Sequence, residues 1–197
     1  MPDLRLLVLR IPGLALGFAF HEFAHAWVYG RLTLEPWVHL DLVGSLLLVF
    51  YGYGWAKPVP VNPYNFRRPK RAMLQVALAG PVTNIIVASF FALLLRLWPG
   101  RLHVPLLLDV IRAGFWVNIG LAAFNILPIP PLDGAKVLAG VVSDEMASIM
   151  EQVERYGPLL LVLLVSTGIV DPLLNAIERL AMTGVVAVVN AVTWFVP

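Results

Sequence analysis

The sequence predicts an all-α polytopic membrane protein with about five to six transmembrane helices. Of its 197 residues, 59% are apolar and 13% are charged, which is about half the charged share of ordinary soluble domains. The mean hydropathy is +0.82, and several apolar stretches approach the roughly 20 residues that a helix needs to cross a bilayer. These figures exclude a disordered chain and argue against a water-soluble globule.

Three apolar stretches are long enough to span the membrane. They cover residues 4–29, 72–98 and 106–127. The later stretches at 158–170 and 180–195 are shorter, and the first of them needs the preceding turn to reach across. We expect one integral-membrane domain over residues 1–197. Its core is expected at 4–140 and its C-terminal helices at 141–197.

Segment 42–55 differs from these spans. A helix of its 14 residues reaches only about 21 Å, and its glycines and aromatic residues favour extended or re-entrant backbone. The following residues 56–71 contain four prolines and five basic residues. Prolines end helices, and basic loops stay in the cytoplasm, so this loop is predicted to be extended and cytoplasmic. Residues 134–157 mix acids and bases and predict one surface helix.

Charge and cysteine content restrict the function. Fourteen basic and twelve acidic residues leave a net charge of +2, which does not indicate a partner such as nucleic acid. There is no cysteine, so disulfides, iron–sulfur clusters and thiolate metal sites are excluded. Any metal site must use His, Asp or Glu.

Residues 21–25 read His-Glu-Phe-Ala-His, an HExxH pattern. Helix positions four apart share one face, so His21 and His25 can bind one Zn²⁺. Glu22 lies beside them and can accept a proton from water. Ionisable side chains are costly in an apolar segment, by about 2.5–3.5 kcal/mol each for Asp, Lys or Arg at a helix centre, so three of them in five positions need a compensating interaction. The alternative is a helix end in the headgroup region with solvated imidazoles.

A catalytic zinc needs a third protein ligand. The candidates beside apolar segments are His39, Asp41, His103, Asp109, Asp133 and Asp171. Asp133 has the most distinctive surroundings, because Pro128, Pro130 and Pro131 precede it and broken backbone at membrane depth is tolerated only in a protein-lined or watery cavity. The alternative role for Asp133 is an N-cap of the following helix.

Taken together, the motifs resemble the site-2 protease family of intramembrane zinc metalloproteases, in its compact bacterial and archaeal branch without a PDZ domain. The matching pieces are HEFAH at 21–25, AGPVTN at 79–84, NILPIPPLDG at 125–134 and GWAKPVPVN at 54–62. The resemblance covers residues 20 to about 140. HExxH alone is a weak signal, and HExxH together with the Leu-Asp-Gly run is a specific one.

The resemblance implies roles for individual residues. His21, His25 and Asp133 are expected to bind one zinc per chain, Glu22 to act as general base and then acid, and Asn125 to hold the oxyanion. It also implies a membrane re-entrant β element near residues 31–62. An edge strand can capture an extended substrate, and Gly52, Tyr53 and Gly54 are expected to supply it. Asn84 follows a Gly-Pro kink and is expected to reach the substrate site or to serve in packing.

The expected metal site also predicts topology. His25 and Asp133 lie at the ends of the first span and of the 106–127 span, and these ends can meet only if segment 42–55 does not cross. The site then faces the cytoplasmic side of a cell membrane, in a prokaryote.

The predicted function is intramembrane zinc endopeptidase. Its partners are the lipid bilayer and transmembrane protein substrates, which are cut within or near their transmembrane segments. The alternatives are a divalent-cation transporter and a catalytically inactive membrane scaffold.

Overall fold

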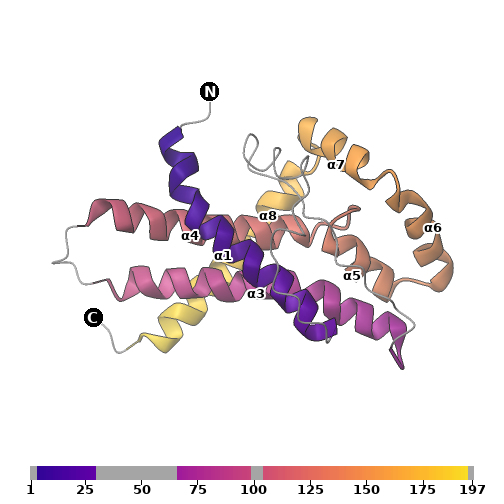
Figure 1. Cartoon of the computed structure of the whole chain (residues 1–197), viewed down its shortest axis with the longest axis horizontal. Helices are drawn as coiled ribbons and strands as arrows, with labels where there is room; N and C mark the ends of the chain where they lie inside the picture. Colours follow the sequence, from indigo (N-terminus) through magenta and orange to yellow (C-terminus); the bar gives the residue numbers. More distant parts are fainter. Residues whose placement is uncertain (1–3, 30–65, 99–103, 195–197) are drawn as a thin grey trace.

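The computed structural model describes residues 4–29, 66–98 and 104–194, and all regular structure in this part of the chain is helical. The helices follow one another in the order α1 (Leu4–Tyr29), α3 (Pro69–Arg96), α4 (Pro105–Asn125), α5 (Asp133–Val141), α6 (Asp144–Glu154), α7 (Gly157–Ser166) and α8 (Asp171–Val192). Figure 1 shows α5, α6 and α7 forming an arc that begins beside α3 and returns with α7 towards α8.

Four described helices are long and apolar enough to cross a membrane, namely α1, α3, α4 and α8. The three long spans expected from the sequence are therefore confirmed, and α8 begins at Asp171 rather than near residue 180. Helix α7 has 10 residues and reaches only about 15 Å, which is too short to cross alone. The described part thus holds four such helices, fewer than the five to six expected for the whole chain.

The expected single helix over residues 134–157 is wrong. Helix α5 ends at Val141 and α6 begins at Asp144. Between them Ser143 has extended backbone, and its hydroxyl accepts a hydrogen bond from the Met146 amide at 3.3 Å. Serine caps a new helix in this way, and the acidic residues at 144 and 145 favour its positive N-terminal end.

Helices α1, α3 and α4 form the layer that carries the site (Figure 1). A Cβ added to Gly13 of α1 would lie 2.5 Å from the Cα of Gly114 of α4, so these two backbones touch. Glycines spaced four apart allow such close crossings of membrane helices, and Gly13 and Gly17 have this spacing. Helices α1 and α4 run in the same direction, and α3 runs antiparallel to both.

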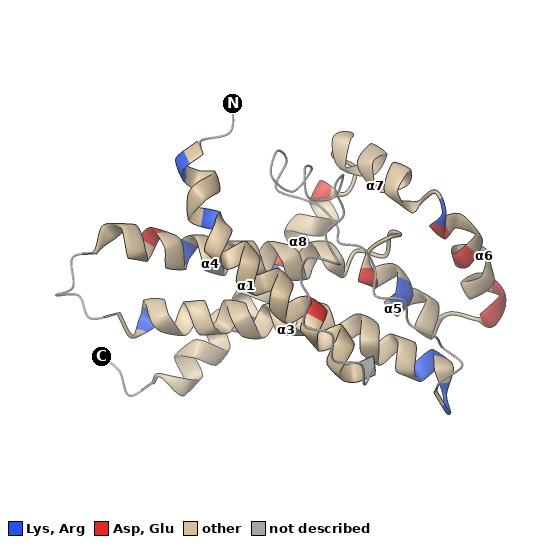
Figure 2. Cartoon of the chain, viewed as in Figure 1, with Lys and Arg blue, Asp and Glu red and all other residues tan. Residues whose placement is uncertain are grey.

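The apolar core has two parts. One joins α3, α4 and α8 through Phe91, Phe115, Ile119 and Val185. The other joins the end of α4 to α7 and α8 and includes Leu127. Many large apolar side chains on the long helices point outward, as lipid-facing residues do, while charged residues gather towards the helix ends and on α5 and α6 (Figure 2).

Candidate metal centre

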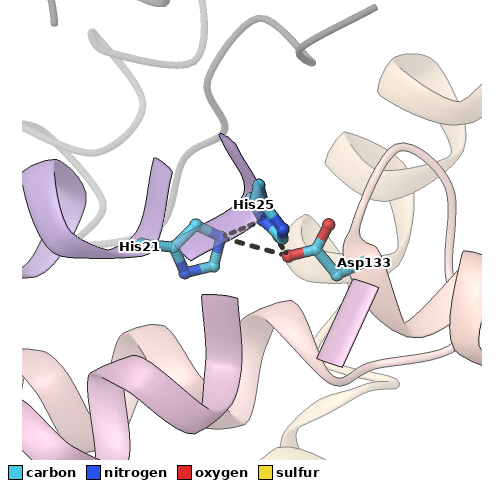
Figure 3. A group of neighbouring side chains, drawn as sticks. All are labelled: His21, His25 and Asp133. Atoms are coloured by element: carbon cyan, nitrogen blue, oxygen red, sulfur yellow. Dashed lines mark hydrogen bonds and ion pairs between the residues drawn. The ribbon is translucent and has the colours of Figure 1, made fainter. Parts of the chain in front are cut away.

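Three buried side chains converge where α1 meets the start of α5 (Figure 3). The Nε2 atoms of His21 and His25 lie 3.0 Å apart. One carboxylate oxygen of Asp133, Oδ2, lies 3.1 Å from each of them. The three residues are 5%, 8% and 8% exposed. Among the residues that the structure describes, this is the one group of three His, Cys, Asp or Glu side chains able to hold a metal ion.

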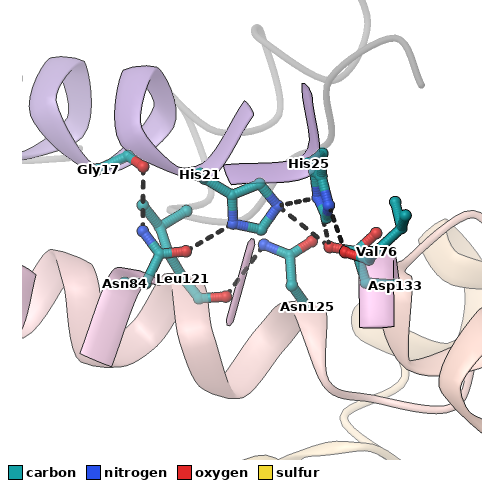
Figure 4. A network of polar contacts seen from close by, with 8 residues as sticks. All are labelled: Gly17, His21, His25, Val76, Asn84, Leu121, Asn125 and Asp133. Carbon is teal, nitrogen blue, oxygen red and sulfur yellow. Dashed lines mark hydrogen bonds and ion pairs between the residues drawn. The ribbon is translucent and has the colours of Figure 1, made fainter. Parts of the chain in front are cut away.

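The other imidazole nitrogens contact helix α3 (Figure 4). His25 Nδ1 lies 2.7 Å from the Val76 carbonyl oxygen, and His21 Nδ1 lies 2.6 Å from Asn84 Oδ1. The Asn84 amide donates to the Gly17 carbonyl at 3.0 Å, which identifies the atom facing His21 as its oxygen. A carbonyl oxygen only accepts hydrogen bonds, so both Nδ1 atoms carry the hydrogen and donate it.

These tautomers make the group fit a metal cation. A neutral imidazole with its hydrogen on Nδ1 has a lone pair on Nε2. With both imidazoles neutral, two such lone pairs and a carboxylate oxygen face one point, which is repulsive unless a proton or a metal cation lies there. Two imidazoles and one carboxylate are a known ligand set of catalytic zinc, which keeps a fourth position open. The Nδ1 contacts are the outer bonds that orient metal-binding histidines.

Asp133 is suited to be the anionic ligand. The residue occupies the first turn of α5, and the N-cap position belongs to Leu132. Its carboxylate therefore faces the two histidines instead of capping the helix.

Two glycines leave room for the group. A Cβ on Gly80 of α3 would lie 2.4 Å from His21 Cε1 and 2.7 Å from His25 Nε2, so the imidazoles pack directly on the α3 backbone. A Cβ on Gly134 would lie 2.2 Å from the carbonyl oxygens of Ile126 and Leu127. Glycine at this position lets the start of α5 approach the end of α4 and brings Asp133 to the histidines.

The group lies in the wall of a cavity of about 740 Å³. Glu22 and Asn125, the two expected catalytic residues, line the same cavity. The Asn125 side chain lies beside the three candidate ligands (Figure 4), and its amide donates to the Leu121 carbonyl at 3.0 Å. The start of α3 and the helices α5 and α6 form the remaining walls.

Other candidate residues lie elsewhere. Asp109 pairs with Arg5 at 3.1 Å, and Asp171 begins α8. The expected substrate strand with Gly52, Tyr53 and Gly54 lies outside the described residues, as do the β element at 31–62 and the alternative ligands His39, Asp41 and His103. Asn84 is fully buried behind His21. Contact with a substrate would require its present hydrogen bonds to break.

Sequence reasoning gave no role to four groups that support the site. These are the Val76 carbonyl, Gly80, Asn118 and Gly134. Gly80 and Gly134 belong to the motifs quoted above. The motifs mark these positions but do not explain why each must be a glycine. Asn118 could have been noticed because it is an amide side chain inside an apolar span. A buried polar side chain is costly there unless it is hydrogen-bonded.

Comparison with known proteins identifies the class of protein that this geometry belongs to. The profile of peptidase family M50 matches residues 101–166. A Bacillus subtilis protein named "Putative zinc metalloprotease YwhC" is 37% identical over 83% of this chain and 84% of its own length. The chain therefore belongs to peptidase family M50, the site-2 proteases, which are zinc metallopeptidases of membranes.

Two further relatives have names of the same kind. A protein of the archaeon Methanocaldococcus jannaschii is 38% identical over 70% of this chain and 73% of its own length. The Mycobacterium tuberculosis protein Rip2 is 30% identical over 66% of this chain and 56% of its own length. Both names begin with "Putative zinc metalloprotease". No solved structure matches the chain.

Proposed function

We propose that this protein is an intramembrane zinc endopeptidase that hydrolyses peptide bonds within or near transmembrane segments of other membrane proteins. The observation that carries the proposal is the convergence of His21 Nε2, His25 Nε2 and Asp133 Oδ2 between apolar helices, in an arrangement that one metal cation would complete. We further propose that the whole chain is one protease domain, since α8 packs on α3 and α4 of the core.

The residues of the cavity divide into ligands and reacting groups. His21, His25 and Asp133 hold the metal, and zinc when bound supplies a Lewis acid that acidifies water and polarises a carbonyl. Glu22 accepts the proton of the attacking water and later delivers it to the leaving amine. Its place next to His21 in α1 and in the cavity wall supports this role.

Asn125 donates a hydrogen bond to the charge that develops on the scissile carbonyl oxygen. An amide nitrogen carries two hydrogens, and the Leu121 carbonyl takes one of them. The second hydrogen is then the donor to the substrate. A neutral donor held in place before the reaction stabilises an oxyanion strongly in a site that excludes water.

The substrate class follows from the membrane setting. A helical peptide bond is shielded by its own backbone hydrogen bonds, so a substrate must be locally extended to be cut. We propose that residues 42–55, which lie outside the described part of the chain, bind it by adding a strand, with Gly52 to Gly54 allowing close backbone approach. The site faces the cytoplasm, because the basic residues at 67–71 open α3 at the same end as the metal group.

The decisive experiment compares the parent protein with Glu22→Gln, measuring both zinc content and cleavage of a model transmembrane substrate. Glu22 is no ligand in this proposal, so Glu22→Gln should hold about one zinc per chain and cleave nothing. Asp133→Ala should lose zinc. Equal cleavage by the parent and Glu22→Gln would contradict the mechanism, and a parent that binds zinc but never cleaves would favour a scaffold or transporter.

Asn125→Ala is the companion variant. It should keep zinc and lose about 10²–10³ in rate, the usual cost of one oxyanion donor. Asn125→Asp should do no better, because a carboxylate repels the developing charge. Cleavage by Asn125→Ala at the parent rate would leave the protease intact as a proposal and assign Asn125 to helix packing.

A further inference from the structure

Two buried, hydrogen-bonded amide side chains lead from the metal group, which consists of His21, His25 and Asp133, into the middle of the helix layer. Asn118 of α4 is fully buried. Its amide nitrogen donates to the Gly114 carbonyl at 2.9 Å and to the Gly13 carbonyl at 3.2 Å. Its oxygen accepts a hydrogen bond at 3.2 Å from the amide nitrogen of Asn84. Asn84 in turn contacts His21, so Asn118 is connected to the metal group through one residue.

The backbone carbonyls fix the orientation of the Asn118 amide. Carbonyl oxygens only accept hydrogen bonds, so the two carbonyls around the Asn118 nitrogen use both of its hydrogens. If the Asn118 amide were turned over, its oxygen would face those two carbonyls and its nitrogen would face the Asn84 nitrogen. All three contacts would become repulsive, so the Asn118 oxygen is held towards Asn84.

The orientation of Asn118 helps to fix the orientation of the Asn84 amide, and Asn84 in turn fixes the tautomer of His21. Two acceptors, the Gly17 carbonyl and the Asn118 oxygen, surround the Asn84 nitrogen, so the Asn84 oxygen must face His21 Nδ1. That oxygen requires a hydrogen on Nδ1 and leaves the lone pair on Nε2, the atom nearest His25 and Asp133. The tautomer that binds a metal is therefore determined by a residue on another helix.

We propose that Asn118 is a positioning residue for the metal centre, which acts through Asn84 to hold His21 in its metal-binding tautomer. The proposal rests on the proposed zinc function. The hydrogen bonds of Asn118 go to Asn84, Gly13 and Gly114 and to none of the three candidate ligands. Its role is distinct from packing because it depends on which amide atom faces Asn84. The close approach of α1 supports it, since a Cβ on Gly17 would lie 2.6 Å from the Asn118 oxygen.

The test begins with Asn118→Leu, which keeps the approximate shape and removes the acceptor. Zinc affinity, measured by competition with a chelator, should fall about tenfold or more, within the 10–100-fold usual for outer-shell partners of metal ligands. In ¹⁵N spectra of the zinc-free protein, the His21 Nδ1 and Nε2 signals should converge as both tautomers become populated. The control Ile119→Ala removes a fully buried neighbour on α4 and should change neither quantity.

A double-mutant cycle separates positioning from general damage. In an Asn84→Ala background the connection is already cut, so adding Asn118→Leu should cost no further zinc affinity. Additive losses would overturn the proposal, as would an unchanged His21 tautomer in Asn118→Leu. If Asn118→Leu does not fold, Asn118→Ala serves the same cycle. A parent protein that binds no zinc would refute the proposed function itself, whereas normal zinc affinity in Asn118→Leu refutes this inference alone.

Discussion

At the scale of single residues, the absence of a side chain at position 80 is as important as the ligands. A Cβ there would lie 2.4 to 2.7 Å from ring atoms of both histidines, closer than real contacts allow. The imidazoles pack on the helix backbone and cannot move away without leaving Asp133. Gly80 therefore sets the distance between α1 and α3 at the metal group.

Gly80→Ala should lower zinc binding while leaving the fold intact. Alanine favours the helix over glycine by about 1 kcal/mol, so helix α3 should persist while the histidine rings are displaced. Zinc per chain and the thermal midpoint of the zinc-free protein are the measurements. The matched control is Gly184→Ala on α8, where an added Cβ meets nothing within 4 Å. Equal zinc content in both variants would contradict the prediction.

At the scale of elements, helix α6 forms one wall of the cavity although none of its residues is buried. It is attached to α3 by Lys70, whose ammonium donates to the Val142 carbonyl and to Asp144 at 2.8 Å. Both acceptors lie at the break between α5 and α6. One side chain therefore holds the point from which α6 extends over the cavity.

Lys70→Met should loosen this attachment. Amide hydrogen exchange over residues 144–154 should become faster than in the parent, while α3 itself is unchanged. Arg71→Met removes the same charge from the same helical turn and is the control. Exchange that is equally fast in both variants would show that charge, and not the Lys70 contacts, matters.

The same attachment has a definite pH dependence. The hydrogen bond from Lys70 holds the pKa of Asp144 below its ordinary value of 3.8. A carboxyl whose pKa is lowered on folding stabilises the fold above the unfolded pKa and loses this effect as the pH falls through the folded one. In the parent, the protection of the α6 amides, measured relative to their intrinsic exchange rates at each pH, should therefore be full at neutral pH and fall below about pH 4.

The sequence allowed prediction of those features that depend on local patterns. The long spans follow from apolar length, and the HExxH spacing places His21 and His25 on one face of α1. The break at Ser143 was missed because the helical pattern of acids and bases continues across it, although a serine before two acids is a capping signal. The role of Asn118 depends on which helices touch, and that information lies in the packing of Gly13, Gly17 and Gly114.

At the scale of the whole molecule, the candidate metal ligands constrain how the described helices are arranged. Helix α1 reaches the group at its C-terminal part, α3 begins beside it, and α4 returns to it. The C-terminal end of α1 and the N-terminal end of α3 therefore lie at the same end of the helix layer. The expectation that segment 42–55 does not cross concerns residues outside the described part and stays a prediction.

Cysteine labelling tests this arrangement directly, because the chain has no native cysteine. Single cysteines near residue 40, near residue 65 and at Arg68 should all react with a membrane-impermeant reagent from the cytoplasmic side. A cysteine at Val104, before α4, should react from the opposite side. Labelling of residues 40 and 65 from different sides would show that the intervening segment crosses.

The separation of the ligands along the chain has a consequence for biosynthesis. Asp133 follows His25 by 108 residues, so at about 5–20 residues per second the ribosome adds the third ligand roughly 5–20 s after the second. The partners that orient the two imidazoles, at Val76 and Asn84, emerge in between. During this interval α1 holds two histidines and a glutamate without their final partners. For the proposed ligand set, stable metal loading is therefore expected after the insertion of α3 and α4, as a late step in the maturation of the newly made protein.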